Sequence, residues 1–119
     1  MIFQNDALKR ETKQDVARGD KGPVNFEHFF PSDLSGGAGR LFSKVTLEKG
    51  SSIGYHVHEG EYELYHILSG EGRYDDNGTD VTLRAGDTAF CPSGEGHSIE
   101  CAGDGPLVFL ALVLFPRGE

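Results

Sequence analysis

The chain has 119 residues, which suits one domain with one hydrophobic core. Its formal net charge of −8 disfavours contact with a phosphate backbone, so we expect no nucleic-acid partner. The N-terminal stretch MIFQNDALKRETKQD lacks the apolar core of a signal peptide. Because no run of about 18 apolar residues occurs either, we predict a cytoplasmic protein without a membrane span.

The first part of the chain, residues 1–22, is polar and charged. Residues 6–18 could form a helical turn or two, although they have no strong apolar face. We expect residues 1–22 to be an N-terminal arm that packs on the rest of the protein, packs on a partner, or is frayed. The rest of the chain, residues 23–119, is predicted to be a single domain.

From residue 24 onward, short apolar stretches alternate with turns rich in glycine, of which the chain has 17. Asn77-Gly78 is a strong hairpin signal because both residues readily adopt positive φ. Turn signals recur about every 8 to 12 residues and no helical period persists, which predicts an all-β sandwich or barrel of about nine or ten strands. The strand patterns that stand out cover residues 24–30, 40–47, 53–58, 61–68, 81–83, 87–91, 97–101 and 106–115.

The last of these stretches is apolar at nearly every position from Leu107 to Phe115. A strand that is apolar on both faces is expected to be buried on both. One face should contact the core of the domain. The other should pack against a second subunit, so we expect a homodimer.

Four residues have the side chains and spacing of a metal site. Alternate side chains of a strand share a face, so His56 and His58 point the same way and could converge on one ion. Glu63 begins the next predicted strand, and His97 could supply a fourth ligand. Three imidazoles and one carboxylate suit Mn, Fe, Ni, Co, Cu or Zn rather than Ca or Mg. Such a set leaves coordination positions for water or substrate.

The spacing of these residues and of several glycines resembles the two sequence motifs of the cupin superfamily. The first motif is matched by Gly50, His56, His58, Glu63 and Gly70, and the second by Gly86, Pro92, Gly94 and His97. The last position of the second motif is usually Asn, and here it is Cys101. Cys101 lies about 13 Å along the strand from His97, too far to reach the same ion, and we expect it deep in the barrel.

The resemblance is to a small single-domain cupin, and it implies a double-stranded β-helix, a jelly-roll barrel with a conical pocket. It also implies that the metal ligands are His56, His58, Glu63 and His97, and it supports the expected homodimer. Cupins with this ligand set include dioxygenases, decarboxylases, isomerases, lyases and proteins that only bind a small molecule. The fold therefore does not decide the function.

Two functional hypotheses follow. The first is a metal-dependent enzyme acting on a small carboxylate, keto or sugar-acid compound, as a Lewis-acid isomerase, lyase or decarboxylase or as a dioxygenase. The alternative is a non-catalytic binding or sensing protein. An enzyme would need an acid or base beyond the ligands. Glu61, near the pocket rim, and Tyr65, on the same face as Glu63, are weak candidates, whereas His66 should point away from the pocket.

Both cysteines are expected to be reduced thiols. A hairpin centred near Gly94 would place Cys91 opposite His97 and Cys101 opposite Asp87, so the two thiols would not be paired neighbours. A cytosolic location also argues against a disulfide. Nearby, Phe90 and Phe109 are expected in the core rather than against a substrate.

Overall fold

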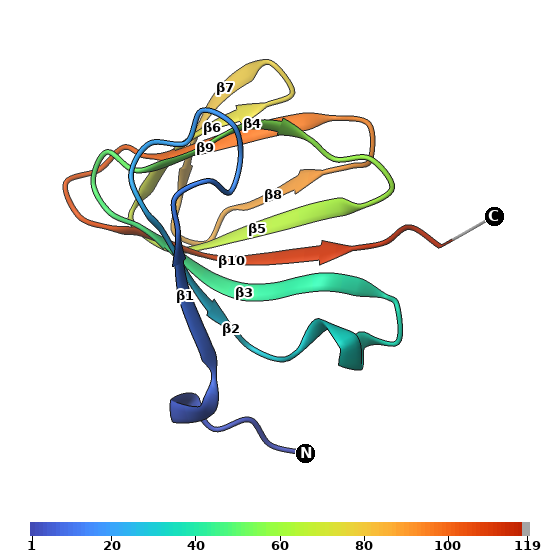
Figure 1. Ribbon diagram of the computed structural model, residues 1–119. Coiled ribbons are helices and arrows are strands. Elements are labelled where there is room, and N and C mark those ends of the chain that lie inside the picture. Colours follow the sequence, from blue (N-terminus) through green and yellow to red (C-terminus); the bar gives the residue numbers. More distant parts are fainter. Residues whose placement is uncertain (118–119) are drawn as a thin grey trace.

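The computed structural model describes residues 1–117, which form two antiparallel sheets packed face to face, so the predicted all-β barrel of the jelly-roll type is confirmed (Figure 1). The larger sheet has the order β1-β2-β3-β10-β5-β8, and the smaller has the order β4-β9-β6-β7. The strands are β1 (Lys9–Lys13), β2 (Val24–His28), β3 (Gly39–Leu47), β4 (Ser52–Val57), β5 (Tyr62–Ser69), β6 (Glu71–Asp76), β7 (Thr79–Arg84), β8 (Thr88–Cys91), β9 (Gly96–Cys101) and β10 (Leu107–Leu114), with short 3₁₀ turns η1 (Asn5–Ala7) and η2 (Ser32–Ser35). Within residues 1–117, no helix is long and apolar enough to cross a membrane.

The core lies between the two sheets, and β10 contributes the centre of its larger wall. Side chains alternate along this strand, so every second residue is fully buried while those between are partly exposed on the outer face. The inward residues are Leu107, Phe109, Ala111 and Val113. Burial of the inner face agrees with the prediction for this strand. Contact of the outer face with a second subunit stays a prediction.

The structure corrects the expectation of helical turns over residues 6–18. Lys9–Lys13 is a strand that pairs antiparallel with β2, from Lys9 opposite His28 to Lys13 opposite Val24. A strand at the edge of a sheet presents unpaired backbone N–H and C=O groups, and β1 satisfies those of β2. The N-terminal residues therefore extend the larger sheet by one strand.

The structure also corrects the expected hairpin between β8 and β9. β8 pairs with β5, which places Cys91 opposite Glu63, whereas β9 pairs with β4, which places His97 opposite His56. The chain crosses from the larger to the smaller sheet at residues 92–95. Because of this crossing, β9 pairs with β4 rather than with β8, and His97 therefore lies next to His56.

Both cysteines lie within the described residues and both are free thiols, as expected, although they belong to different sheets rather than to one hairpin. Cys101 is buried in the core. The expectation that Phe90 is a core residue is wrong, because 52% of it is exposed on the outside of β8. Phe109 is fully buried as expected.

Turn geometry follows the sequence closely at the predicted hairpin. Asn77 and Gly78 have φ values of 49° and 102°, and they connect β6 to β7 with Asp76 opposite Thr79. Gly70 also has a positive φ, of 87°, and a Cβ there would overlap with the backbone carbonyl oxygen of Pro106. Gly70 is therefore required both by its conformation and by its close neighbour.

We predict that Gly70→Ala destabilises the protein more than Gly86→Ala. Gly86 also has a positive φ, of 93°, but has open space around its Cα. The control should lower the free energy of unfolding by about 1 kcal/mol, and Gly70→Ala by about 3 kcal/mol because overpacking adds to the backbone cost. Urea unfolding measures both values. Equal losses in the free energy of unfolding would show that the close approach to Pro106 adds nothing to the cost of Gly70→Ala.

Candidate metal centre

The candidate metal centre is assembled from both sheets. His56 lies on β4, His58 follows β4 directly, and His97 lies on β9 of the same sheet. Glu63 comes from β5 of the larger sheet, so the four side chains meet between the two sheets. His58, Glu63 and His97 are buried, whereas 25% of the His56 side chain is exposed.

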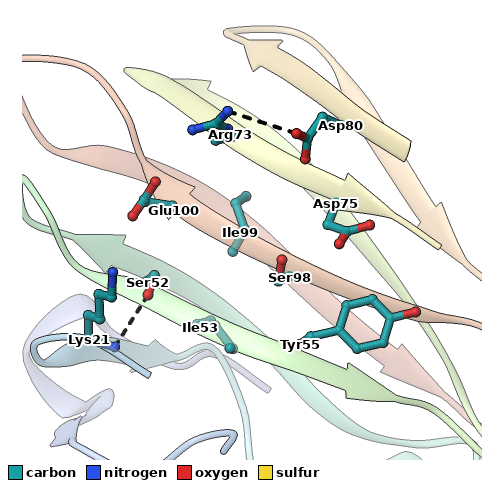
Figure 2. Close-up of a pocket in the computed structure, with 11 residues that line it drawn as sticks. Lys21, Ser52, Ile53, Tyr55, Arg73, Asp75, Asp80, Ser98, Ile99 and Glu100 are labelled. Atoms are coloured by element: carbon teal, nitrogen blue, oxygen red, sulfur yellow. Dashed lines mark hydrogen bonds and ion pairs between the residues drawn. The ribbon is translucent and has the colours of Figure 1, made fainter. Parts of the chain in front are cut away.

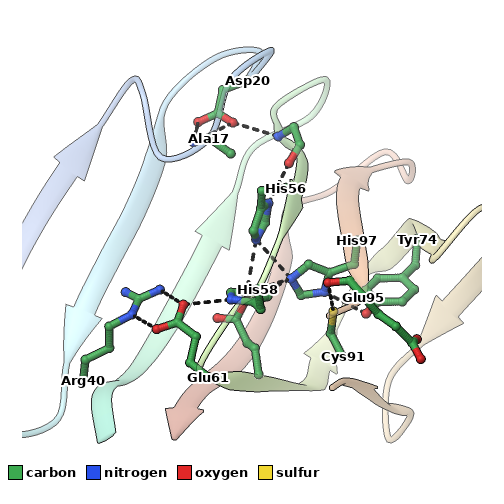
Figure 3. Close-up of polar contacts among 12 residues, drawn as sticks. Ala17, Asp20, Arg40, His56, His58, Glu61, Tyr74, Cys91, Glu95 and His97 are labelled. Carbon is green, nitrogen blue, oxygen red and sulfur yellow. Dashed lines mark hydrogen bonds and ion pairs between the residues drawn. The ribbon is translucent and has the colours of Figure 1, made fainter. Parts of the chain in front are cut away.

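The donor atoms of these four side chains converge on one point, and Figure 3 shows the three histidine rings facing one another. The Nε2 atom of His97 lies 3.0 Å from that of His58, 3.1 Å from that of His56 and 3.1 Å from Oε1 of Glu63. His58 Nε2 and Glu63 Oε1 are 3.0 Å apart. Bonds of about 2.1 Å to a central ion separate adjacent ligand atoms by about 3 Å in an octahedron, so the spacing suits a metal ion.

The outer nitrogen of each imidazole ring is held by a hydrogen bond. The partners are the backbone carbonyl of Gly54 for His56, the carboxylate of Glu61 for His58 and the hydroxyl of Tyr74 for His97, each at 2.8 Å. A carbonyl and a carboxylate only accept, so His56 and His58 donate from Nδ1 and keep a lone pair on Nε2. This tautomer of the neutral ring is the one that a metal requires, and the Nε2 atoms of His56 and His58 lie 3.1 and 3.0 Å from that of His97.

Burial and charge keep Glu63 ionised. Burial alone would raise its pKa, but the imidazole rings of His56, His58 and His97 around its carboxylate outweigh burial and lower its pKa well below the usual range for a glutamate. Burial lowers the pKa of His97, which favours its neutral form. Deprotonated ligands are the ones that bind a metal, so both shifts favour metal binding, whereas the contact with Glu63 raises the pKa of His58 and so gives a metal a proton to displace there.

Glu61 contacts the site through His58 and is itself held by Arg40 from β3. The guanidinium of Arg40 donates from Nε and from Nη2 to the two carboxylate oxygens of Glu61, at 2.6 and 2.7 Å. The hydrogen bond from Arg40 is the main reason that the pKa of Glu61 falls to about 2. The arrangement is a chain of ionic contacts from Arg40 through Glu61 to His58, which orients the His58 ring.

Arg40 and Tyr74 are functional candidates that the sequence reasoning missed. Neither belongs to the spacing pattern of the histidines, and each reaches the site from a strand distant in sequence, β3 or β6. Tyr74 is nevertheless buried, and burial raises the pKa of its hydroxyl above the usual range. No local pattern identifies these two residues, because only pairing of the strands brings them near the histidines.

A cavity of about 200 Å³ opens in front of His56, His58 and Glu63. Its lining combines apolar core residues with charged residues from the N-terminal part of the chain. Members of the lining are Lys13, Asp15, Val16, Phe26, Arg40, Leu41, Val45, Ile53, Tyr65, Phe109 and Ala111. Tyr65 lines the pocket as expected and stacks on His97 with ring centroids 4.9 Å apart.

The two remaining histidines lie outside the donor group. His66 is exposed and contacts Thr88 on the outer face, as predicted. His28 contacts Ser43 at 2.6 Å and Glu11 at 2.8 Å, and thereby ties β2 to its two neighbouring strands. Both therefore have partners that account for their positions without a ligand.

A shallow depression lies on the outer face of the smaller sheet (Figure 2). Its polar lining includes Tyr55, Arg73 and Asp80, with Arg73 and Asp80 paired at 3.8 Å. It contains none of the four converging donors. The cavity in front of His56 is therefore the better candidate for ligand binding.

Known proteins resemble this chain along nearly its whole length. An oxalate-binding protein from Thermotoga maritima is 48% identical over 114 residues, which make up 96% of this chain and 93% of that protein. Oxalate decarboxylase from Bacillus subtilis is 27% identical over 135 residues, covering 93% of this chain but only 35% of the enzyme. The crystal structure of a predicted oxalate decarboxylase from Thermotoga maritima is 42% identical, with a TM-score of 0.90, and covers 98% of this chain and 100% of that one.

The family assignment rests on the sequence and the fold together. A family model described as a cupin domain matches residues 43–113, which include all four converging donors. The relative with 48% identity extends the similarity to both sides of that segment. The chain belongs to the cupin family.

Proposed function

We propose that this cupin binds oxalate or a similarly small dicarboxylate at a single divalent transition-metal ion. The ion would be held by His56, His58, Glu63 and His97. The observation that carries the proposal is the convergence of these four donors beside a cavity of about 200 Å³. The similarity to an oxalate-binding protein across 96% of the chain supports the choice of ligand.

The cavity has the charge and size that a small dianion needs. When bound, the ion supplies a Lewis acid that accepts carboxylate oxygens. Arg40 and Lys13 bring two cations to the cavity wall, against one carboxylate besides the proposed ligand, that of Asp15. A volume of about 200 Å³ accommodates a ligand of a few carbon atoms. Oxalate meets both conditions.

The side chains around the cavity favour binding over turnover. Loss of CO₂ from oxalate leaves a carbon that must receive a proton. Glu61 is ionised, and both of its oxygens already accept hydrogen bonds, from Arg40 and His58. Burial is the main reason that the pKa of Tyr65 is raised, which makes it a weak acid. Neither residue is suited to supply that proton at neutral pH.

Decarboxylation is the second candidate function. The similarity to oxalate decarboxylase from Bacillus subtilis favours it, since it covers 93% of this chain. In that case Tyr65 is the proton donor we would test first, because it lines the cavity beside Glu63. Formate and CO₂ would be the products.

We further propose that the protein is a homodimer that pairs through the outer face of the larger sheet. Four apolar residues stand directly opposite one another across neighbouring strands of this face. In order across the sheet they are Phe42, Leu112, Leu64 and Phe90. Phe42 is 37% exposed and Phe90 52% exposed, so a second copy would remove apolar surface from water.

We predict that His97→Ala abolishes metal binding whereas His66→Ala preserves it. His97 contacts the other three donors, whereas His66 lies on the outer face. In wild type, Mn²⁺ at 100 times its dissociation constant should stabilise the fold by about 2.7 kcal/mol. Elemental analysis and thermal unfolding with and without Mn²⁺ measure the effect. Equal metal content in both variants would contradict the proposed ligand set.

We predict that oxalate binds the Mn²⁺-loaded protein and does not bind the metal-free protein. Arg40→Gln should weaken binding about 10-fold, or about 1.4 kcal/mol, because it removes a cation from the cavity and leaves Glu61 without its partner. Arg73→Gln, in the outer depression, is the matched control. Isothermal titration calorimetry measures affinity, and assays for formate and CO₂ in the same samples decide between binding and decarboxylation. Binding that is independent of metal would refute the proposed site.

We predict that Leu112→Glu converts the dimer to a monomer, because it places a charge at the centre of the apolar row. Val81→Glu is the control, since Val81 is an exposed apolar residue that lies on β7 of the smaller sheet. Light scattering coupled to size-exclusion chromatography measures the mass. A monomeric wild type would refute the dimer without affecting the metal site.

A further inference from the structure

The segment that connects β1 to β2 lies over the metal cavity. We name residues 14–20 of this connection the strap. Figure 1 shows the connection leaving the larger sheet and passing beside β4 of the smaller sheet. Asp15 and Val16 of the strap line the same cavity as His56. Just beyond the strap, the backbone of Lys21 pairs with that of Ser52 at 2.7 and 3.3 Å.

Asp20 holds the strap in a fixed shape. Its carboxylate accepts a hydrogen bond from the backbone N–H of Val16 at 2.7 Å and from that of Ala17 at 3.2 Å. The same carboxylate accepts a third hydrogen bond, from the backbone N–H of Gly54 on β4, at 2.7 Å. One side chain therefore closes the strap on itself and attaches it to the strand that carries His56 (Figure 3).

The backbone N–H of Gly54 is free to donate this hydrogen bond because β4 is irregular there. The register between β4 and β9 shifts between Ile53 and His56, so Gly54 does not pair in the ladder. A Cβ at Gly54 would also overlap with the backbone carbonyl oxygen of Arg18 in the strap. The strap and β4 thus meet backbone to backbone, and only glycine permits this approach.

The carbonyl oxygen of Gly54 in turn accepts the hydrogen bond that orients His56, at 2.8 Å. His56 is the most exposed of the four donors, with 25% of its side chain accessible, compared with 1% for His97. It also faces the cavity that the strap helps to line. A shift of the strap would therefore move the orienting carbonyl of the ligand with the least packing around it.

We propose that Asp20 is a positioning residue that couples the strap to His56, so that the strap holds this ligand in its metal-binding orientation while forming one wall of the carboxylate cavity. The part that concerns oxalate rests on the proposed function, whereas the coupling to the metal does not. Asp20 contacts neither the ion site nor the ligand. It acts on the ion site only indirectly, first through the backbone of Gly54 and then through the ring of His56.

Asp20→Ala tests the coupling. In the metal-free protein, hydrogen–deuterium exchange at Val16, Ala17 and Gly54 should accelerate, because each amide loses its acceptor. Co²⁺ affinity should fall about 10-fold, at the lower end of the range for partners of metal ligands, and the Co²⁺ absorption spectrum should change as His56 reorients. Oxalate affinity of the loaded protein should fall by a similar factor. Asp20→Asn retains one acceptor oxygen and should lie between wild type and Asp20→Ala.

Asp104→Ala is the matched control, because it removes the same charge from a fully exposed side chain distant in sequence from the strap. Gly54→Ala displaces the strap without altering Asp20 and should reproduce the change in the Co²⁺ spectrum. The coupling would be overturned if Asp20→Ala exchanged faster but kept the Co²⁺ affinity and spectrum of wild type. It would also be overturned if hydrogen–deuterium exchange in Asp20→Ala were unchanged. If wild type binds Co²⁺ but no oxalate, the proposed function fails, and the comparison of Co²⁺ spectra still decides the role of Asp20.

Discussion

The crowding of unshared electron pairs at the centre of the barrel dominates this structure. Nε2 of His97 lies about 3 Å from the Nε2 atoms of His56 and His58 and from the carboxylate oxygen of Glu63, in a mostly buried space. Such an arrangement is unfavourable unless a metal ion or bound protons offset the repulsion. The rest of the fold can be understood as the means of holding these groups together.

Each of the three histidines is held by a different kind of partner, and the partners connect the candidate site to distant parts of the chain. A backbone carbonyl orients His56, a carboxylate orients His58 and a phenol orients His97. Arg40 holds the carboxylate in turn, from the opposite sheet. The metal centre is therefore sensitive to both walls of the barrel. These same contacts keep Glu61 ionised, so the residue that orients His58 has no proton to supply to a reaction.

The N-terminal residues belong to the site rather than standing apart from it. β1 extends the larger sheet, Lys13 brings a cation to the cavity wall, and Asp20 joins the following segment to β4. A cavity that is open on one side in the barrel is thereby partly enclosed by a polar segment. The cavity wall thereby gains a cation from Lys13 and a carboxylate from Asp15.

The sequence by itself determined the all-β class, most strand positions and the identity of the four converging donors. These depend on local quantities: alternation along strands, turn residues such as Asn77-Gly78, and the fixed spacing of His56, His58 and Glu63. Only the tertiary structure decided which strands pair, and sequence reasoning was wrong about the partner of β9 for that reason. The roles of Arg40, Tyr74 and Asp20 depend on contacts between residues distant in the chain. No local pattern records such contacts, because sheet pairing and the crossing between sheets create them.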